Sequence, residues 1–248
     1  MAVATQTERP WAVEQSKNTR RQLVLAAMRL MAEKGIGVVS LRSVNAAAGA
    51  RNASAAHYHF GNKLGLIKAI VETLEQDVAA VRAPLIAKLR AQSATRKPCA
   101  RQIIEAAYGP FMGLLFHPEY ALPGIKFLSR LIVDTGPELR VIANRFTGPL
   151  AHEVLDLLRD ALPNVPPRVL KMRILFSLIN LINGMSDVLA RATSPFGDMS
   201  TPGSLEAANY FIDYITAGIS APPTAMTDEF VAQSREIIRT YSESGHAR

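Results

Sequence analysis

The sequence predicts an all-α protein with a small N-terminal helix-turn-helix domain followed by a larger helical domain. Three observations lead to this fold. Between the breaks in the chain, apolar residues recur every three or four positions, as in amphipathic helices, and no segment alternates like a strand. A short helix, a glycine-containing turn and another short helix precede residue 62. The excess positive charge lies in the same region.

The helix-turn-helix domain is predicted over residues 16–62, after a flexible polar tail at residues 1–15. Ser40 is a favourable N-cap for the second helix, because its hydroxyl can accept a backbone N–H, and Gly49 ends that helix. The flanking helices are expected from Asn18 to Glu33 and from Ala53 to Phe60.

A helical ligand-binding and dimerisation domain is predicted over residues 63–248. Asn62 can cap a helix that begins at Lys63. The middle of the predicted helix at 167–191 is apolar on nearly every side, so other elements must cover most of its faces. The helices expected after the first are Glu72 to Gln92 (kinked near Pro84), Cys99 to Phe116, Gly124 to Asp134, Pro137 to Ala161, Pro167 to Arg191, Ser204 to Ala217 and Asp228 to Ser242.

Composition predicts a soluble cytoplasmic protein without a membrane partner. Of the 248 residues, 48% are hydrophobic and 20% charged, which is ordinary for a folded domain. The single cysteine, Cys99, excludes an internal disulfide and a cysteine-based zinc site. The longest apolar stretch, Ile174 to Met185, is shorter than the roughly 18 residues of a membrane span. We expect no metal and no cofactor.

The positive charge points to a polyanion. Residues 17–68 contain nine Lys or Arg and one acid, Glu33, whereas residues 76–248 contain 18 basic and 16 acidic residues. Scattered surface cations would serve solubility alone. A basic module joined to a nearly neutral one instead predicts a DNA-binding head on a body with another task.

One face of the third helix is predicted to meet DNA. If Ala56 and Phe60 point into the head, Ser54 and Tyr58 face outward with His57 beside them, and His59 lies nearer the border. The alternative for Tyr58 is packing at a domain interface. Metal binding by the two histidines is disfavoured, since no carboxylate or cysteine accompanies them.

Further contacts are expected around this helix. Arg51 and Asn52 lie in the turn, where they can reach bases or backbone. Arg42 and Lys63 lie at helix starts, where positive charge and the helix N-terminus together favour phosphate. Each of these two could also be an ordinary solvated charge.

The segment from Thr19 to Ile70, TRRQLVLAAMRLMAEKGIGVVSLRSVNAAAGARNASAAHYHFGNKLGLIKAI, resembles the DNA-binding domain of the TetR family. The matching features are the small-residue run ending in Gly49, the sequence YHFG at 58–61, and Lys63 opening the next helix. The resemblance implies that Arg42, Tyr58, His59 and Lys63 hold phosphates while residues 51–57 read bases. Two departures stand out: the turn at 50–52 is one residue longer than in many members, and Gly65 replaces an acidic helix former, which should weaken the cap of that helix.

The resemblance also implies a dimer, in which the helices at 167–191 and 204–217 form a four-helix interface with their twins. Gly184 would permit close approach there. The alternative is a central core helix. Ser177, Asn180, Gly184 and Asp187 form a polar stripe that would be either a hydrogen-bonded dimer seam or part of a ligand cavity.

A mostly apolar pocket with a few polar anchors is expected in the larger domain. Arg130 could anchor an acidic ligand, or instead form a salt bridge to Asp134. The candidate ligand-binding residues are Tyr108, Phe111, Met112, Phe116, Phe127, Arg130, Phe146, Ser177 and Asn180; Gly184 and Asp187 are the dimerisation candidates.

These patterns predict a ligand-responsive repressor that binds palindromic double-stranded operator DNA as a homodimer and is released by a small, largely apolar effector. An enzyme is disfavoured, because the sequence has no nucleophile elbow, phosphate-binding glycine loop or metal-ligand spacing. The other alternative is a DNA-binding organiser that responds to no small molecule. A hollow cavity in the larger domain would favour the ligand-responsive repressor, and a filled core would favour the organiser.

Overall fold

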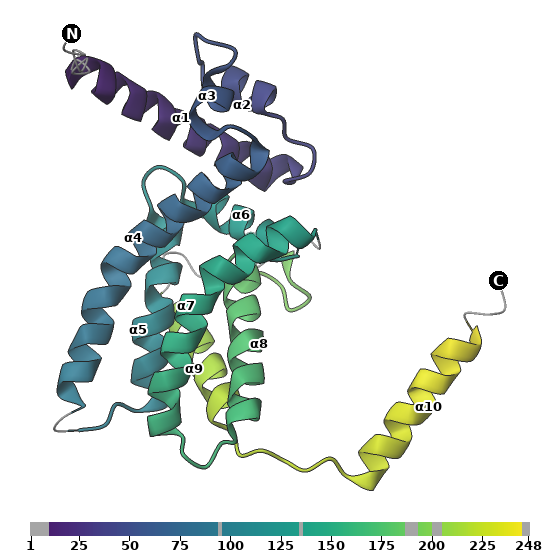
Figure 1. The fold of residues 1–248 in the computed structure, drawn as a ribbon. Helices are drawn as coiled ribbons and strands as arrows, with labels where there is room; N and C mark the ends of the chain where they lie inside the picture. Colours follow the sequence, from purple (N-terminus) through teal and green to yellow (C-terminus); the bar gives the residue numbers. More distant parts are fainter. Residues whose placement is uncertain (1–9, 94–95, 134–135, 187–192, 200–204, 245–248) are drawn as a thin grey trace, which may run out of the picture.

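The fold was analysed in a computed structural model that describes residues 10–93, 96–133, 136–186, 193–199 and 205–244 (Figure 1). Its helices are α1 (Pro10–Lys34), α2 (Leu41–Ala47), α3 (Ala55–Phe60), α4 (Lys63–Gln92), α5 (Ala100–Gly113), α6 (Ala121–Val133), α7 (Pro137–Ala161), α8 (Pro167–Ser186), α9 (Leu205–Ser220) and α10 (Asp228–Ser244), with a 3₁₀ turn η1 (Leu114–Phe116). The all-α prediction is confirmed. A head of α1–α3 stands on a body of α4–α9, and α10 extends away from the body (Figure 1).

The first helix starts earlier than predicted. Residues 10–15 belong to α1, so the expected flexible tail at 1–15 is wrong for them, and residues 1–9 lie outside the described part of the chain. A proline suits the first turn of a helix, because its missing N–H would have no intrahelical partner there. Pro10 therefore begins the helix where polarity alone predicted a tail.

A single helix joins the head to the body. The predicted segments beginning at Lys63 and Glu72 are one 30-residue helix, α4, which continues through Pro84. A proline inside a helix removes one hydrogen bond and costs about 3 kcal/mol. Burial of Val78, Ile86 and Leu89 on either side of Pro84 offsets that cost, since these side chains pack into the body.

The core of the body is built from the buried sides of α5, α6, α7 and α8. Tyr108 of α5 and Phe127 of α6 are completely buried. The Tyr108 hydroxyl lies 2.6 Å from Oγ of Ser177 on α8, and Ser177 Oγ also donates to the carbonyl of Ile174 at 2.8 Å. Burial raises the pKa of Tyr108, so the phenol stays neutral. This pair connects α5 to α8 through satisfied polar atoms.

Polar contacts fasten the head to α6 and the segment before it. Arg130 Nε donates to the carbonyl of Ala32 at 2.8 Å, and its Nη2 donates to the carbonyl of Glu33 at 3.1 Å. Arg29 Nη2 donates to the backbone carbonyl of Glu119 at 2.9 Å, and Arg21 forms an ion pair with the Glu119 carboxylate. Helix α1 is therefore held near its middle and at its C-terminal end.

Gly124 permits the close approach of α6 to α4. A Cβ at this position would lie 2.7 Å from a ring carbon of Tyr120 and 3.1 Å from a methyl carbon of Leu74. The Tyr120 ring cannot easily move aside, because its hydroxyl donates to Asp77 and it stacks on His117 with centroids 3.7 Å apart.

We predict that Gly124→Ala lowers the free energy of unfolding by about 1–3 kcal/mol, the usual cost of overpacking a core. The control is Gly113→Ala, since a Cβ at that exposed helical glycine meets nothing within 4 Å. The control should be neutral or slightly stabilising, because alanine is the better helix former. Urea unfolding followed by circular dichroism measures both variants, and equal stabilities would contradict the proposed close contact.

Candidate nucleic-acid interface

Asn45 connects the two short helices of the head. Its side chain is buried on α2, where Nδ2 donates to the carbonyl of Ala53 and Oδ1 accepts the N–H of Ala56 at 2.8 Å. The amide therefore fixes the start of α3 against α2. Asn45 was not singled out in the sequence analysis. A polar residue next to Val44, on the side of α2 that faces inward, indicates a buried side chain with hydrogen-bond partners.

The exposed face of α3 is the predicted one. Ala56 is buried and Phe60 half-buried, whereas His57 is exposed and the Tyr58 side chain is 81% exposed. An exposed tyrosine offers a ligand both the apolar surface of its ring and a hydroxyl that can hydrogen-bond. The structure leaves His57 and Tyr58 available to an approaching ligand, and the alternative that Tyr58 packs at a domain interface within the chain is not supported.

His59 lies at the border of this face, half-buried as predicted. Burial, and to a lesser extent the charge of Arg20, lowers the pKa of His59. Its imidazole is therefore neutral at pH 7, when it can donate one hydrogen bond to a phosphate without adding charge. Arg20 also lies over the Phe60 ring, 5.3 Å from its centroid, which ties α1 to the end of α3.

The turn before α3 presents polar groups to solvent. Arg51, Asn52 and Ser54 are all exposed. Oδ1 of Asn52 accepts the backbone N–H of Ser54 at 2.9 Å, and this local turn delays the start of the helix from the predicted Ala53 to Ala55. The side-chain amide donors of Asn52 and the Arg51 guanidinium can both reach toward a ligand on the α3 side.

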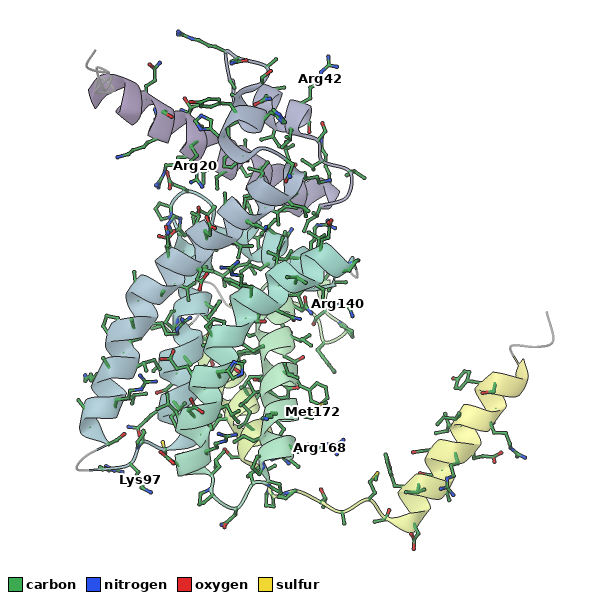
Figure 2. The ribbon with its side chains drawn as sticks, in the orientation of Figure 1. Arg20, Arg42, Lys97, Arg140, Arg168 and Met172 are labelled. Atoms are coloured by element: carbon green, nitrogen blue, oxygen red, sulfur yellow. The ribbon has the colours of Figure 1, made fainter. Side chains whose placement is uncertain are left out.

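The two predicted phosphate contacts at helix starts differ in the structure. Arg42, in the first turn of α2, is exposed and points outward from the head (Figure 2). Lys63 is half-buried, and its Nζ donates to the carbonyl of Gly37 at 2.6 Å. Lys63 therefore stabilises the α1–α2 loop in this structure, so a role at a phosphate would require it to share that bond.

The prediction that Gly65 weakens the N-terminal cap of α4 is wrong. Asn62 Oδ1 accepts the N–H of Gly65 at 2.9 Å, which caps α4 in the ordinary way. A Cβ at position 65 would lie 2.0 Å from the carbonyl oxygen of Phe60, so a larger residue would force apart the tight turn between α3 and α4. The glycine is required by the close approach of the two helices.

Four of the residues predicted to line a pocket are buried in the core of the body. Tyr108, Phe111, Phe127 and Phe146 are buried, and Phe111 meets Phe146 edge to face with centroids 6.1 Å apart. Met112 is half-buried against the same core. Aromatic rings that fill the interior in this way stabilise the fold by burying large apolar areas.

Three other candidates lie outside the core. Phe116 is 74% exposed, because α5 ends at Gly113 and the chain turns through η1. Arg130 is an exposed residue that holds α1, and Asn180 is exposed on α8, away from the buried Ser177. The polar stripe therefore divides between the core and the surface. Asp134 and Asp187 lie outside the described residues, so their predicted contacts are not tested.

A groove that no sequence pattern indicated lies between the head and the body. It has a volume of about 770 Å³ and runs along the C-terminal end of α1, α6 and the end of α8. Two cations, Lys126 and Arg130, and one acid, Glu33, line it, so positive charge is in excess. Ser129 donates to Asn183 at 2.7 Å, and Ile36 and Val133 add apolar surface. The groove therefore suits a small molecule with an acidic group and an apolar portion.

One side of α8 presents an apolar stripe to solvent. Met172, Leu175, Phe176 and Ile179 are exposed, while the opposite side, including Ile174 and Leu178, is buried in the body. On the neighbouring α9, Tyr210 and Tyr214 are exposed, and Gly184 is exposed where α8 approaches Phe211. We call the six exposed large residues the α8–α9 face. Its existence contradicts the interpretation of α8 as a fully enclosed core helix.

Two remaining features of the chain concern a membrane span in α8 and a metal site. By length and hydropathy α8 would pass for a membrane span, with 20 residues and a mean hydropathy of 1.2. Its polar contact with α5 and its contacts with α6, α7 and α9 instead make it a structural helix of the body. Within the described ranges, no group of three or more His, Cys, Asp or Glu could hold a metal ion.

The sequence and the fold both have relatives. A model of bacterial regulatory proteins of the tetR family matches residues 23–70, and a model of tetracyclin repressor-like C-terminal domains matches residues 105–218. Together they cover more than half of the chain. A comparison with curated proteins gave no match.

Two solved structures illustrate the shared fold. A TetR family transcription regulator from Marinobacter aquaeolei has a TM-score of 0.56 and 15% identity, over 83% of this chain and 97% of that chain. NalD, the secondary repressor of the MexAB-OprM multidrug efflux pump in Pseudomonas aeruginosa, has a TM-score of 0.55 and 20% identity, over 84% of this chain and 98% of its own. At these identities the similarity shows the fold alone.

We predict that Asn45→Ala loosens α3 from α2. Two backbone groups of the α3 start, the Ala53 carbonyl and the Ala56 N–H, lose their partner, which should cost about 1–3 kcal/mol. Hydrogen exchange of the Ala56 amide should accelerate by at least tenfold. Asn18→Ala, at an exposed position of α1, is the control and should leave this rate unchanged. An unaltered Ala56 rate in Asn45→Ala would show that the side chain does not support α3.

Proposed function

The chain belongs to the TetR family of bacterial regulatory proteins, and on that premise we propose that it is a transcriptional repressor. It binds palindromic operator DNA as a homodimer, in the cytoplasm where the chromosome lies, and a small molecule releases it. The observation that carries this proposal is the exposed face of α3, on which the Tyr58 and His57 side chains are open to solvent in a basic head.

On DNA, α3 enters the major groove with its exposed face toward the base edges. His57, Ser54 and the turn residues Arg51 and Asn52 lie where they can meet bases, since they share that side of the head and are exposed. Arg42 and the Tyr58 hydroxyl reach the phosphates on either side, and neutral His59 donates one further hydrogen bond. Lys63 joins them by sharing its bond with Gly37.

Dimerisation uses the α8–α9 face. An exposed apolar stripe of this size on a folded chain is the signature of an interface, and α8 and α9 of two copies can bury each other's stripes around a two-fold axis. Because one head contacts only a few base pairs, two heads at a fixed spacing are needed for a palindromic operator. Gly184 lies at the edge of this contact, near Phe211.

The effector acts through α6. This helix touches the body core through Phe127 and holds α1 through Arg130, so a molecule in the groove beside it competes for the contacts that fix the head. A small acid with an apolar portion would pair with Lys126 or draw the Arg130 guanidinium away from the α1 carbonyls. The head could then move, and a shift of a few ångströms separates the two recognition helices from successive major grooves.

A second candidate is a DNA-binding organiser without an effector. The packing of Phe111 on α5 against Phe146 on α7 favours it, because these two buried rings meet edge to face within the core. The two functions are separated by screening small acids for compounds that raise the melting temperature. A repressor with an effector has a stabilising compound that also releases operator DNA, and an organiser has none.

We predict a division of labour among the head residues on DNA. Arg42→Ala should weaken binding to all sequences and lower the salt slope of binding by about one, because it removes one phosphate contact. His57→Ala should instead change which operator variants are preferred, by about 1–3 kcal/mol for a lost base contact. Titrations of the protein with its own upstream DNA at several salt concentrations measure both effects.

The matched control for this experiment is Arg140→Ala, which removes an exposed cation from α7 on the body (Figure 2). It should alter neither the salt slope nor the sequence preference. If the Arg42 and Arg140 variants lose affinity equally, attraction by the overall charge of the protein explains the binding, and the docking of the head is wrong.

We also predict that Phe176→Arg produces monomers. The substitution places a charge without a partner in the centre of the α8–α9 face, and burying it against a second copy would be strongly unfavourable. Analytical ultracentrifugation should show the monomer, and operator binding should fall by at least tenfold while circular dichroism stays unchanged. Val141→Arg, at an exposed apolar residue of α7, is the control and should remain dimeric. A dimeric Phe176→Arg protein would move the interface elsewhere.

A further inference from the structure

Helix α10 is amphipathic but stands apart from the rest of the chain. Phe230, Ile237 and Ile238 are between 56% and 65% exposed, and they recur at helical spacing on one side. Figure 1 shows the helix extending away from the body at the end of an extended linker. Three large apolar side chains on one stripe are the pattern of a helix that packs against another surface.

An isolated α10 would have little stability. The helix has 17 residues, close to the length at which single helices are marginal in water even for favourable sequences. Its sequence contains β-branched Val231, Ile237, Ile238 and Thr240, which are poorer helix formers than alanine or leucine. Packing of its apolar stripe is therefore what would hold it as a helix.

The chain leaves the body at a fixed point. Nη1 of Arg173 on α8 donates to the carbonyl of Ile219 at 2.9 Å and also to the carbonyl of Ala221. The linker at 221–227 is then exposed and without helical structure. In the view of Figures 1 and 2, α10 lies on the side of α8 toward which Met172 points. The arm thus emerges beside the α8–α9 face.

We propose that α10 is an exchanged arm, in which its apolar stripe packs on the body of a second copy of this chain. The inference rests on the proposed homodimer. If the two α8–α9 faces meet, each linker begins at the edge of that interface, and seven extended residues can span up to about 25 Å. The first body within reach on that side is the partner's, since the same side of the arm's own subunit is covered by the dimer contact.

Charge favours the same occupant. Both heads must face one DNA duplex, so a two-fold axis brings the two body ends that lie far from the heads to the same level. The start of α8 at that end is basic, because Arg168 and Lys171 are exposed there and residues 167–173 contain no acid. The first turn of α10 is acidic, with Asp228 and Glu229. The arm of one copy can therefore set its acidic first turn near the basic start of α8 in the other.

Photo-crosslinking in the full-length dimer tests the exchange. One copy carries a polyhistidine tag and p-benzoylphenylalanine in place of Ile237, and it is co-expressed with an unmodified copy that carries a different tag. Irradiation should give a covalent product that contains both tags. Ala232, on the opposite side of α10, is the matched control position, and its both-tag product should be at least five times less abundant. A crosslink within one chain, or none, overturns the proposal.

A second measurement uses affinity between copies. Ile237→Glu combined with Ile238→Glu should raise the dimer dissociation constant by at least tenfold in sedimentation experiments, and Ala232→Glu should leave it unchanged. An unchanged constant in the double variant overturns the exchange. The two proposals fail in different ways: a wild-type chain that is monomeric and does not bind its upstream DNA refutes the repressor dimer. A wild-type dimer that binds DNA but gives no both-tag crosslink refutes only the arm.

Discussion

The position of the head depends on how α1 is held against α6. The last carbonyls of a helix have no intrahelical donors, and a cation near them is favoured by the helix dipole. Arg130 of α6 supplies hydrogen-bond donors and a positive charge to the backbone carbonyls of Ala32 and Glu33. The opposite side of α6 is buried in the core of the body. With α1 fixed in this way, α2 and α3 inherit their orientation through Asn45 and through the packing of α1.

The second attachment lies near the middle of α1 and is electrostatic. Hydrogen bonding from Arg21 lowers the pKa of Glu119, so the carboxylate is charged and bound at neutral pH. The pair is largely exposed, and a surface ion pair of this kind contributes at most about 1 kcal/mol. The buried packing of α1 on α6 therefore carries most of the attachment, and the polar contacts set its register.

Many of the exposed large apolar residues lie on α8, α9 and α10, and these helices lie away from α3 in Figure 1. This separation keeps self-association away from DNA. The proposed DNA contact of the head rests on charge and hydrogen bonds, which salt weakens, whereas the proposed dimer contact rests on burial of apolar area, which salt does not screen. The two contacts can therefore respond independently to ionic conditions.

The sequence by itself determined the helical fold, the helix-turn-helix and the outward face of α3, because helical periodicity and capping are local properties of neighbouring residues. Only the tertiary structure decided which apolar residues are core and which are surface. Phe127 and Phe116 look alike in the sequence, yet one is enclosed and the other lies on a turn after α5 has ended. The sequence made Arg130 a candidate ligand anchor, and the structure shows that its guanidinium binds carbonyls at the end of α1. Gly65 resembled a weak cap until the carbonyl of Phe60 was found where a side chain would be. Each of these outcomes depends on atoms brought together by the fold, and periodicity along a single helix cannot reveal which helix its apolar side will meet.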